Sequence, residues 1–134
     1  MNPLKTAVFP GSELTVRWFE PTGKPQGIVV FCHGYGASGT DLVGLAAELA
    51  HVRPELGEGL VWAFPEAPLS PPELAIFGGR AWWPLDTGKI ERMLRSGKLR
   101  DLANDEPPGL SSARRKLTVL LDAMLRRSIS PCRG

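Results

Sequence analysis

Apolar residues in the first half of the chain follow the spacing of β-strands. Residues 6–9 and 13–19 are apolar or alternate between apolar and polar side chains, and a Pro-Gly-Ser sequence typical of a tight turn separates them. Residues 28–32 and 60–64 are instead continuous apolar runs, which is how strands covered on both faces of a parallel sheet read. The pattern predicts an N-terminal hairpin followed by two buried parallel strands.

Helical spacing appears between these two runs and again near the C-terminus. The first set of apolar positions follows Asp41, whose charge suits the first turn of a helix, and consists of Leu42, Leu45, Ala46 and Leu49. The second set lies within residues 112–127, with a serine at the expected N-cap, and consists of Ala113, Leu117, Leu120, Leu121 and Met124. The first helix joins the two apolar runs into a βαβ unit, so the fold class is α/β. Ile90, Met93 and Leu94 predict a further short helix that Gly97 weakens and residues 104–109 interrupt.

Composition and charge are those of a folded, soluble chain. The 134 residues are 43% hydrophobic and 22% charged, and the formal net charge is only +2. Such a charge gives no argument for nucleic acid or an anionic membrane, and no segment approaches the ~20 apolar residues of a membrane span. The N-terminus shows no secretory signal, so we expect a cytoplasmic location.

The cysteines and histidines suggest neither a metal site nor a thiol enzyme. Cys32 lies inside an apolar run, where a thiol is expected to be a small buried hydrophobe, and Cys132 lies in a polar tail. His33 directly precedes a glycine-rich loop, and its ring is expected to brace that loop through hydrogen bonds. His51 ends a helix and is expected to be solvated. These residues lack the spacing of metal ligands, and no cofactor is implied.

The loop at residues 33–42, His-Gly-Tyr-Gly-Ala-Ser-Gly-Thr-Asp-Leu, is the most informative segment. Closely spaced glycines let the backbone turn sharply and bring its N–H groups against a ligand oxygen. Such a loop can stabilise the negative charge that develops on a substrate carbonyl, as half of an oxyanion hole does. A nucleotide-binding turn is the competing interpretation, but Thr40 stands where G-x-G-x-x-G requires its last glycine, and no P-loop lysine follows.

Two further motifs follow this loop in order: Phe-Pro-Glu-Ala-Pro at 64–68 and Arg-Ala-Trp-Trp-Pro-Leu-Asp at 80–86. Together the three segments resemble the HGxGA, FPxAP and RAW(W/F/Y)xxD motifs of the phospholipase/carboxylesterase family of α/β-hydrolases, which includes the acyl-protein thioesterases. The resemblance extends from about residue 16 to about residue 127. It implies an α/β-hydrolase fold and hydrolysis of carboxylic esters or thioesters through an acyl-serine intermediate.

The resemblance also implies roles for particular residues. The backbone N–H of Tyr35 would be one oxyanion donor, and the loop residues that support it are His33, Gly34 and Gly36. The residues expected to bind a small-molecule ester or acyl substrate are Leu69, Phe77, Trp82 and Trp83. The two tryptophans could equally plug the core, because sequence does not separate an acyl-binding groove from a buried aromatic pair.

The sequence departs from the family where the nucleophile should follow. No G-x-S-x-G stands anywhere in the 134 residues, and the acid and histidine that follow the serine in this fold are not found either. We therefore expect an incomplete α/β-hydrolase fold, lacking the nucleophile strand and the C-terminal half. Its expected parts are a hairpin (1–20), a βαβ unit with the oxyanion loop (28–64), the FPxAP turn and tryptophan-rich loop (65–110), a helix (111–127) and a tail without strand character (128–134).

Three hypotheses for function remain from the sequence. The chain is a truncated and inactive member of a serine carboxylesterase family, a non-catalytic acyl- or lipid-binding protein, or the non-functional product of a disrupted reading frame. In each case a sheet strand without its neighbour leaves an exposed edge, through which we expect self-association.

Overall fold

The computed structural model describes residues 2–98 and 104–128, which form an α/β structure around one four-stranded mixed sheet. The strands are β1 (Lys5–Val8), β2 (Thr15–Phe19), β3 (Gly27–Val30) and β4 (Leu60–Pro65), in the spatial order β1-β2-β4-β3. Strands β1 and β2 form the predicted antiparallel hairpin, β2 pairs antiparallel with β4, and β3 pairs parallel with β4. The crossover from β3 to β4 is the predicted βαβ unit.

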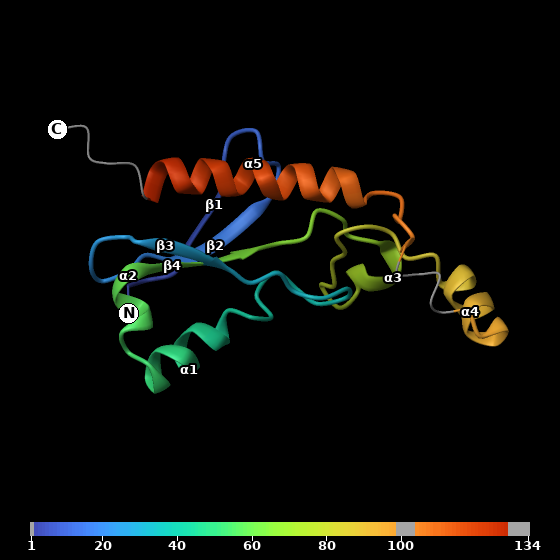
Figure 1. The fold of residues 1–134 in the computed structure, drawn as a ribbon, viewed down its shortest axis with the longest axis horizontal. Coiled ribbons are helices and arrows are strands. Elements are labelled where there is room, and N and C mark those ends of the chain that lie inside the picture. The colour runs from blue at the N-terminus through green and yellow to red at the C-terminus, as the bar shows by residue number, and fades with distance from the viewer. Residues whose placement is uncertain (1, 99–103, 129–134) are drawn as a thin grey trace.

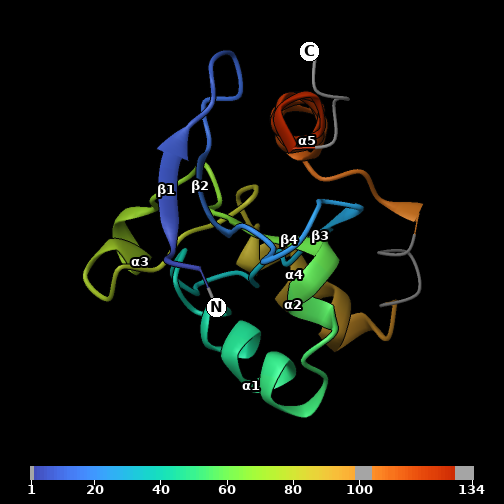
Figure 2. The same ribbon diagram turned by 90° about the vertical axis from the view of Figure 1, so that its left-hand side faces the viewer.

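Helices cover both faces of this sheet. They are α1 (Gly44–Val52), α2 (Leu56–Gly59), α3 (Pro72–Ala75), α4 (Thr87–Ser96) and α5 (Leu110–Ser128). Figures 1 and 2 show α5 lying across one face and α1 beneath the other, while α4 projects away from the sheet. No residue of α4 is buried, so its position is set by loops rather than by core packing.

Alternation along the two central strands divides the core between the faces. Val16 and Trp18 of β2, with Val61 and Ala63 of β4, point toward α5, where Leu120 and Met124 complete one cluster. Trp62 and Phe64 point the other way and pack with Ala46 of α1. Because successive strand residues face opposite sides of a sheet, β4 needs apolar residues at every position, which explains its continuous apolar run.

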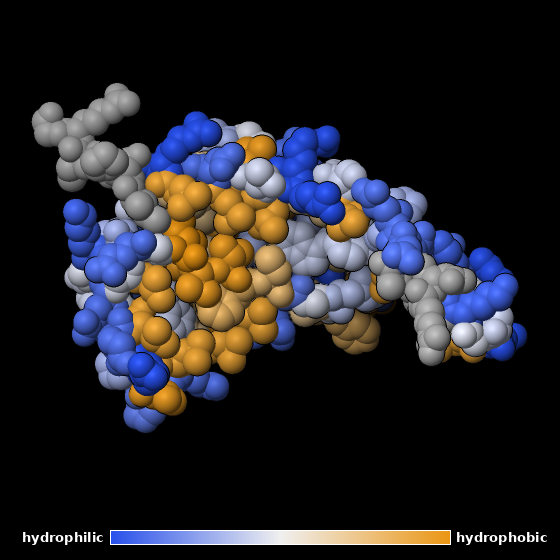
Figure 3. Space-filling view, viewed as in Figure 1, coloured by the Kyte–Doolittle hydropathy of each residue, from blue (hydrophilic) through white to orange (hydrophobic). Residues whose placement is uncertain are grey.

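Strand β3 is the open edge that the missing neighbour strand predicts, since no other described strand pairs with its outer side. The prediction that both of its faces are covered is wrong for one face: Ile28 and Val30 pack against the cluster beneath α5, whereas Val29, which points to the other face, is 36% exposed. Figure 3 shows apolar side chains gathered on the surface of this region, below α5. An apolar run therefore marked both β4, which is buried, and β3, which is the edge of the described sheet.

Helices α1, α4 and α5 differ in detail from the sequence pattern. Asp41 lies in the turn before α1 and not in its first turn, and only Ala46 of the predicted apolar face is buried, because the short helix covers only part of the sheet. Helix α5 begins at Leu110, so the predicted serine N-cap lies inside it; Ser128, assigned to the tail, is its last residue. Gly97 caps the C-terminus of α4 in the left-handed conformation instead of weakening it.

Cys32 is exposed, which corrects the prediction of a buried strand residue, because β3 ends at Val30 and the chain leaves the sheet before the thiol. Cys132 and residues 129–134 of the predicted tail lie outside the described residues. Within the described part of the chain, no helix combines the length and apolar character needed to cross a membrane.

Candidate functional site

Three loops meet beyond the carboxyl ends of β3 and β4, where ligands commonly bind in α/β folds. The glycine-rich loop after β3 pairs with the tryptophan loop: Gly36 N donates to Arg80 O, and Arg80 N donates to Ala37 O, each at 2.9 Å. The tryptophan loop also forms a two-bond bridge to the turn after β4, between Leu69 and Ala81. The three motifs quoted from the sequence are therefore one connected structure.

His33 joins two of these loops from a buried position. Its Nε2 atom accepts a hydrogen bond from Ala67 N at 3.0 Å, so the ring proton lies on Nδ1, which donates to Gly34 O at 2.9 Å. Trp82 Nε1 donates to His33 O at 2.8 Å. Both ring nitrogens are engaged in bracing, which leaves neither free to act as a general base.

Arg80 and Glu66 hold the tryptophan loop against the turn after β4 through hydrogen bonds and an ion pair. The sequence analysis did not identify either as a site residue. The Arg80 guanidinium donates to Ala67 O at 2.7 Å and to Pro68 O at 3.3 Å, and it lies 3.6 Å from Glu66. Glu66 also lies 3.5 Å from Arg17 of β2. A charged residue inside each apolar motif was the signal that could have pointed to this pair.

Two glycines allow the loops to approach closely. Gly36 has φ +84°, a conformation that other residues rarely adopt. A Cβ atom on Gly79 would lie 2.6 Å from Gly36 O. The backbone at the turn of the glycine-rich loop is therefore packed directly against the tryptophan loop, with no room for a side chain between them.

Tyr35 lies at the exposed side of this turn. Its backbone N–H, like that of Gly34, donates no hydrogen bond to any described residue, whereas the N–H groups of Gly36 and Ala37 are used within the loops. Tyr35 is 42% exposed. The loop thus holds unpaired N–H groups in a fixed backbone, the arrangement needed to bind a ligand oxygen.

The predicted substrate-binding residues are partly brought together. Trp82 and Trp83 line a hollow of about 240 Å³ with His33, Tyr35 and Leu85. Leu69 lines an adjoining hollow of about 340 Å³ that also includes Tyr35. Phe77 does not join them: it is 86% exposed and lines none of the hollows at this end of the sheet.

The two tryptophans combine the roles that the sequence left open. Both are half-buried, and Trp82 packs against the cluster beneath α5 while its indole N–H holds the glycine-rich loop. Trp83 packs against Gly109, the residue before α5: a Cβ atom added to Gly109 would lie 3.1 Å from the Cβ atom of Trp83. Trp82 therefore supports the glycine-rich loop, and both tryptophans form a wall of the hollow beside Tyr35.

Cys32 faces a third hollow, of about 330 Å³, between His33, the two tryptophans and α5. Desolvation by the surrounding side chains raises the pKa of the Cys32 thiol above its usual value. A raised pKa lowers the thiolate fraction at neutral pH, so the thiol is a poor nucleophile.

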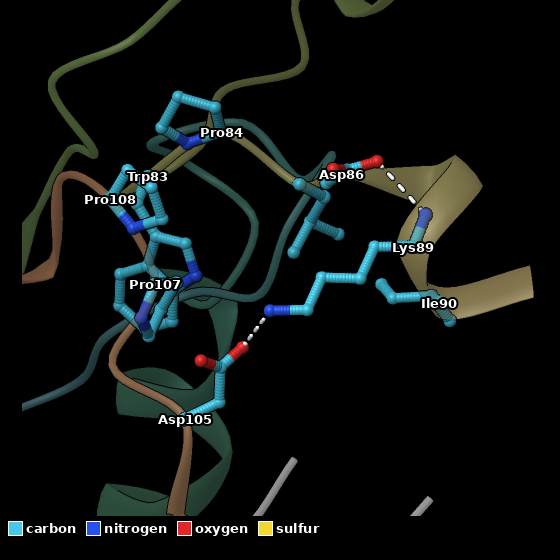
Figure 4. A pocket seen from close by; sticks show the side chains of 9 residues that line it. Trp83, Pro84, Asp86, Lys89, Ile90, Asp105, Pro107 and Pro108 are labelled. Carbon is cyan, nitrogen blue, oxygen red and sulfur yellow. Dashed lines mark hydrogen bonds and ion pairs between the residues drawn. The ribbon is translucent and has the colours of Figure 1, made fainter. Parts of the chain in front are cut away.

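A larger hollow of about 530 Å³ lies on the other side of Trp83, between α4 and residues 105–108. Figure 4 shows Trp83 and the prolines on one side of it and residues of α4 on the other. None of the residues predicted for the site except Trp83 lines it.

Among the described residues no group of three His, Cys, Asp or Glu side chains could hold a metal ion. Comparison of the chain with protein-family models, curated proteins and solved structures finds no match. The chemistry of the site is that of a rigid loop whose Tyr35 and Gly34 N–H groups are unpaired among the described residues, beside an apolar, tryptophan-lined hollow.

Proposed function

We propose that this chain forms the oxyanion side and the acyl-binding wall of a carboxylic ester hydrolase of the α/β-hydrolase type. The observation that carries the proposal is the Tyr35 N–H, which is unpaired among the described residues in a loop held by Arg80 and His33, beside the hollow lined by Trp82 and Trp83. A donor held in place before the substrate arrives needs no rearrangement as charge develops on the carbonyl oxygen.

The described residues supply no activated nucleophile for this site. Its sequence contains no G-x-S-x-G, His33 is engaged by Ala67 and Gly34, and the pKa of Cys32 is raised. Donors alone polarise a bound carbonyl but do not form an acyl intermediate. In isolation, the chain is expected to bind acyl groups without hydrolysing them.

Binding is tested by backbone amide NMR with butyl butyrate, a small neutral ester. The Tyr35 amide and the indole N–H of Trp82 should shift together and saturate, because the ester oxygen and acyl chain occupy adjacent places. Matched titration with dibutyl ether, which lacks the carbonyl, should move the indole signal but leave the Tyr35 amide unchanged. Absence of a Tyr35 shift with the ester would defeat the proposal.

Catalysis is tested separately with p-nitrophenyl butyrate. We expect neither a burst nor turnover, since no acyl-serine can form. Turnover that a serine-directed fluorophosphonate abolishes would show an unrecognised nucleophile. The hydroxyls to examine would then be Ser38, Ser111 and Ser112.

The second candidate function is an acyl- or lipid-binding protein without a catalytic partner, favoured by the apolar lining around Trp82 and Trp83. It predicts equal affinity for butyl butyrate and dibutyl ether, because an apolar wall does not distinguish an ester from an ether.

A further inference from the structure

The hollow beside α4 has the size and lining of a small-ligand site that is separate from the oxyanion loop. Its volume of about 530 Å³ lies within the range of pockets that hold small organic molecules. It opens between α4 and the segment before α5, and Trp83 also lines the hollow beside the oxyanion loop. Its two sides differ in chemistry.

One side is rigid and apolar. It is formed by Trp83 with three prolines, Pro84, Pro107 and Pro108. Proline rings and an indole lose little conformational freedom when a ligand binds, because the prolines have fixed φ angles and the tryptophan has only two side-chain torsions. This side suits an apolar, preferably aromatic, ligand body.

The other side carries a net negative charge. Lys89 of α4 extends across the hollow, and its Nζ atom lies 2.6 Å from Asp105 Oδ2 (Figure 4). Asp86 caps α4 by accepting a hydrogen bond from Lys89 N at 2.9 Å. Two carboxylates and one ammonium group therefore line the hollow, and only Asp105 pairs with the ammonium. The second oxygen of each carboxylate accepts no hydrogen bond from a described residue.

We propose that this hollow binds an organic cation, an ammonium group attached to an apolar body. The apolar body of the ligand packs on Trp83 and the prolines. Its ammonium group lies beside Asp105, in the place that the Lys89 ammonium group now occupies. An indole ring adds attraction for a cation that a neutral ligand does not receive. An anionic ligand would instead have to separate Lys89 from Asp105 and face the carboxylates, so the charge of the site selects against it.

The test compares three probes of similar shape on the full chain: 2-phenylethylammonium, 2-phenylethanol and 3-phenylpropionate. The signal observed is the indole N–H of Trp83 in an NMR titration, assigned with Trp83→Phe. We expect the ammonium to bind most tightly, the alcohol several-fold more weakly and the carboxylate most weakly. Equal affinity for all three, or tightest binding of the carboxylate, would overturn the proposal.

Substitutions of Lys89 and Asp105 should change the affinity for the ammonium probe in opposite directions. Lys89→Met removes the competing internal cation, so ammonium affinity should rise about threefold, the size of effect that an exposed charge pair has. Asp105→Asn should lower it by about the same factor. Lys98→Met, beyond α4 and outside the hollow, is the matched control and should change nothing. The N-cap hydrogen bond to Asp86 uses the Lys89 backbone N–H, so Lys89→Met should keep helix α4. A loss of ammonium binding in this variant would therefore contradict the proposal.

Discussion

His33 Nε2 accepts a hydrogen bond from the backbone N–H of Ala67 at 3.0 Å, across 34 residues of chain. Both residues are buried, so no water replaces the bond if the ring is removed. This one contact joins the loop after β3 to the turn after β4. It makes the position of the predicted oxyanion loop depend on a segment that is distant in sequence.

Replacement of His33 by leucine should therefore destabilise the fold by about 1–3 kcal/mol, the cost of leaving a buried N–H without an acceptor. His33→Gln should recover part of this loss, because its amide oxygen can reach toward the same N–H. Urea unfolding of both variants measures the difference. Equal stability of the leucine and glutamine variants would mean that the ring acts through its volume and not through its acceptor.

Gly79 gives a second prediction about the same junction. An alanine methyl group at this position would meet Gly36 O at 2.6 Å, and a backbone atom cannot move aside as a flexible side chain can. Gly79→Ala should cost about 1–3 kcal/mol of unfolding free energy. Gly44→Ala is the matched control: nothing lies within 4 Å of its added methyl, and it stands at the start of α1. This control should be neutral or gain up to about 1 kcal/mol, and a loss in both variants would refute the argument from close approach.

The sequence predicted those parts of the fold that depend on local patterns. Alternation defined the hairpin strands, and the apolar stripe of α5 placed Leu120 and Met124 in the core where the structure has them. The continuous apolar run at β3 predicted cover on both faces, but Val29 is 36% exposed; the open edge itself was expected, from the missing neighbour strand and not from the run. Pattern alone does not distinguish an edge strand from a central one.

The sequence predicted only those parts of the site that lie within one continuous segment. The glycine-rich loop was visible as a motif, but the contacts that fix it come from Arg80 and Glu66, whose pairing depends on two loops meeting in space. The Arg127 guanidinium near the end of α5 likewise lies over the rings of Phe9 and Trp18, at 5.8 and 5.2 Å from their centroids. Such long-range contacts leave no periodic trace in the sequence.

Cys32 supplies a prediction on pH. Desolvation raises its pKa, so alkylation by iodoacetamide should reach half its maximal rate at a higher pH than for a cysteine in an unfolded peptide. The folded chain favours the neutral thiol, because its pKa is higher there than in the unfolded chain. The stability that this difference contributes is complete below the unfolded pKa and is lost as pH rises through the folded pKa.

The measurement is the pH dependence of the alkylation rate in Cys132→Ser, so that only Cys32 reacts. The same variant in denaturant provides the unfolded reference. A folded-state midpoint at or below that of the unfolded chain would contradict the desolvation argument.

The outer edge of β3 leads to the last prediction. Phe31 N donates to Ala63 O, so the odd-numbered residues of this strand direct their backbone groups toward β4. In a parallel pair, the N–H and C=O groups of the intervening residues, such as Ile28 and Val30, then point outward, where no described strand meets them. An apolar edge of this kind pairs readily with a second chain.

We expect the chain to self-associate as its concentration rises, and Val29→Lys to reduce this association. Val29 is partly exposed on β3, so a lysine there can reach solvent without disturbing the core, while its charge opposes close approach of a second edge. Val52→Lys is the matched control, because Val52 is 72% exposed at the end of α1 and does not belong to the sheet. Sedimentation velocity over a concentration series should show association for the unmodified chain and Val52→Lys, and weaker association for Val29→Lys. A monodisperse monomer at every concentration, or equal association of the two lysine variants, would show that the chain does not associate through β3.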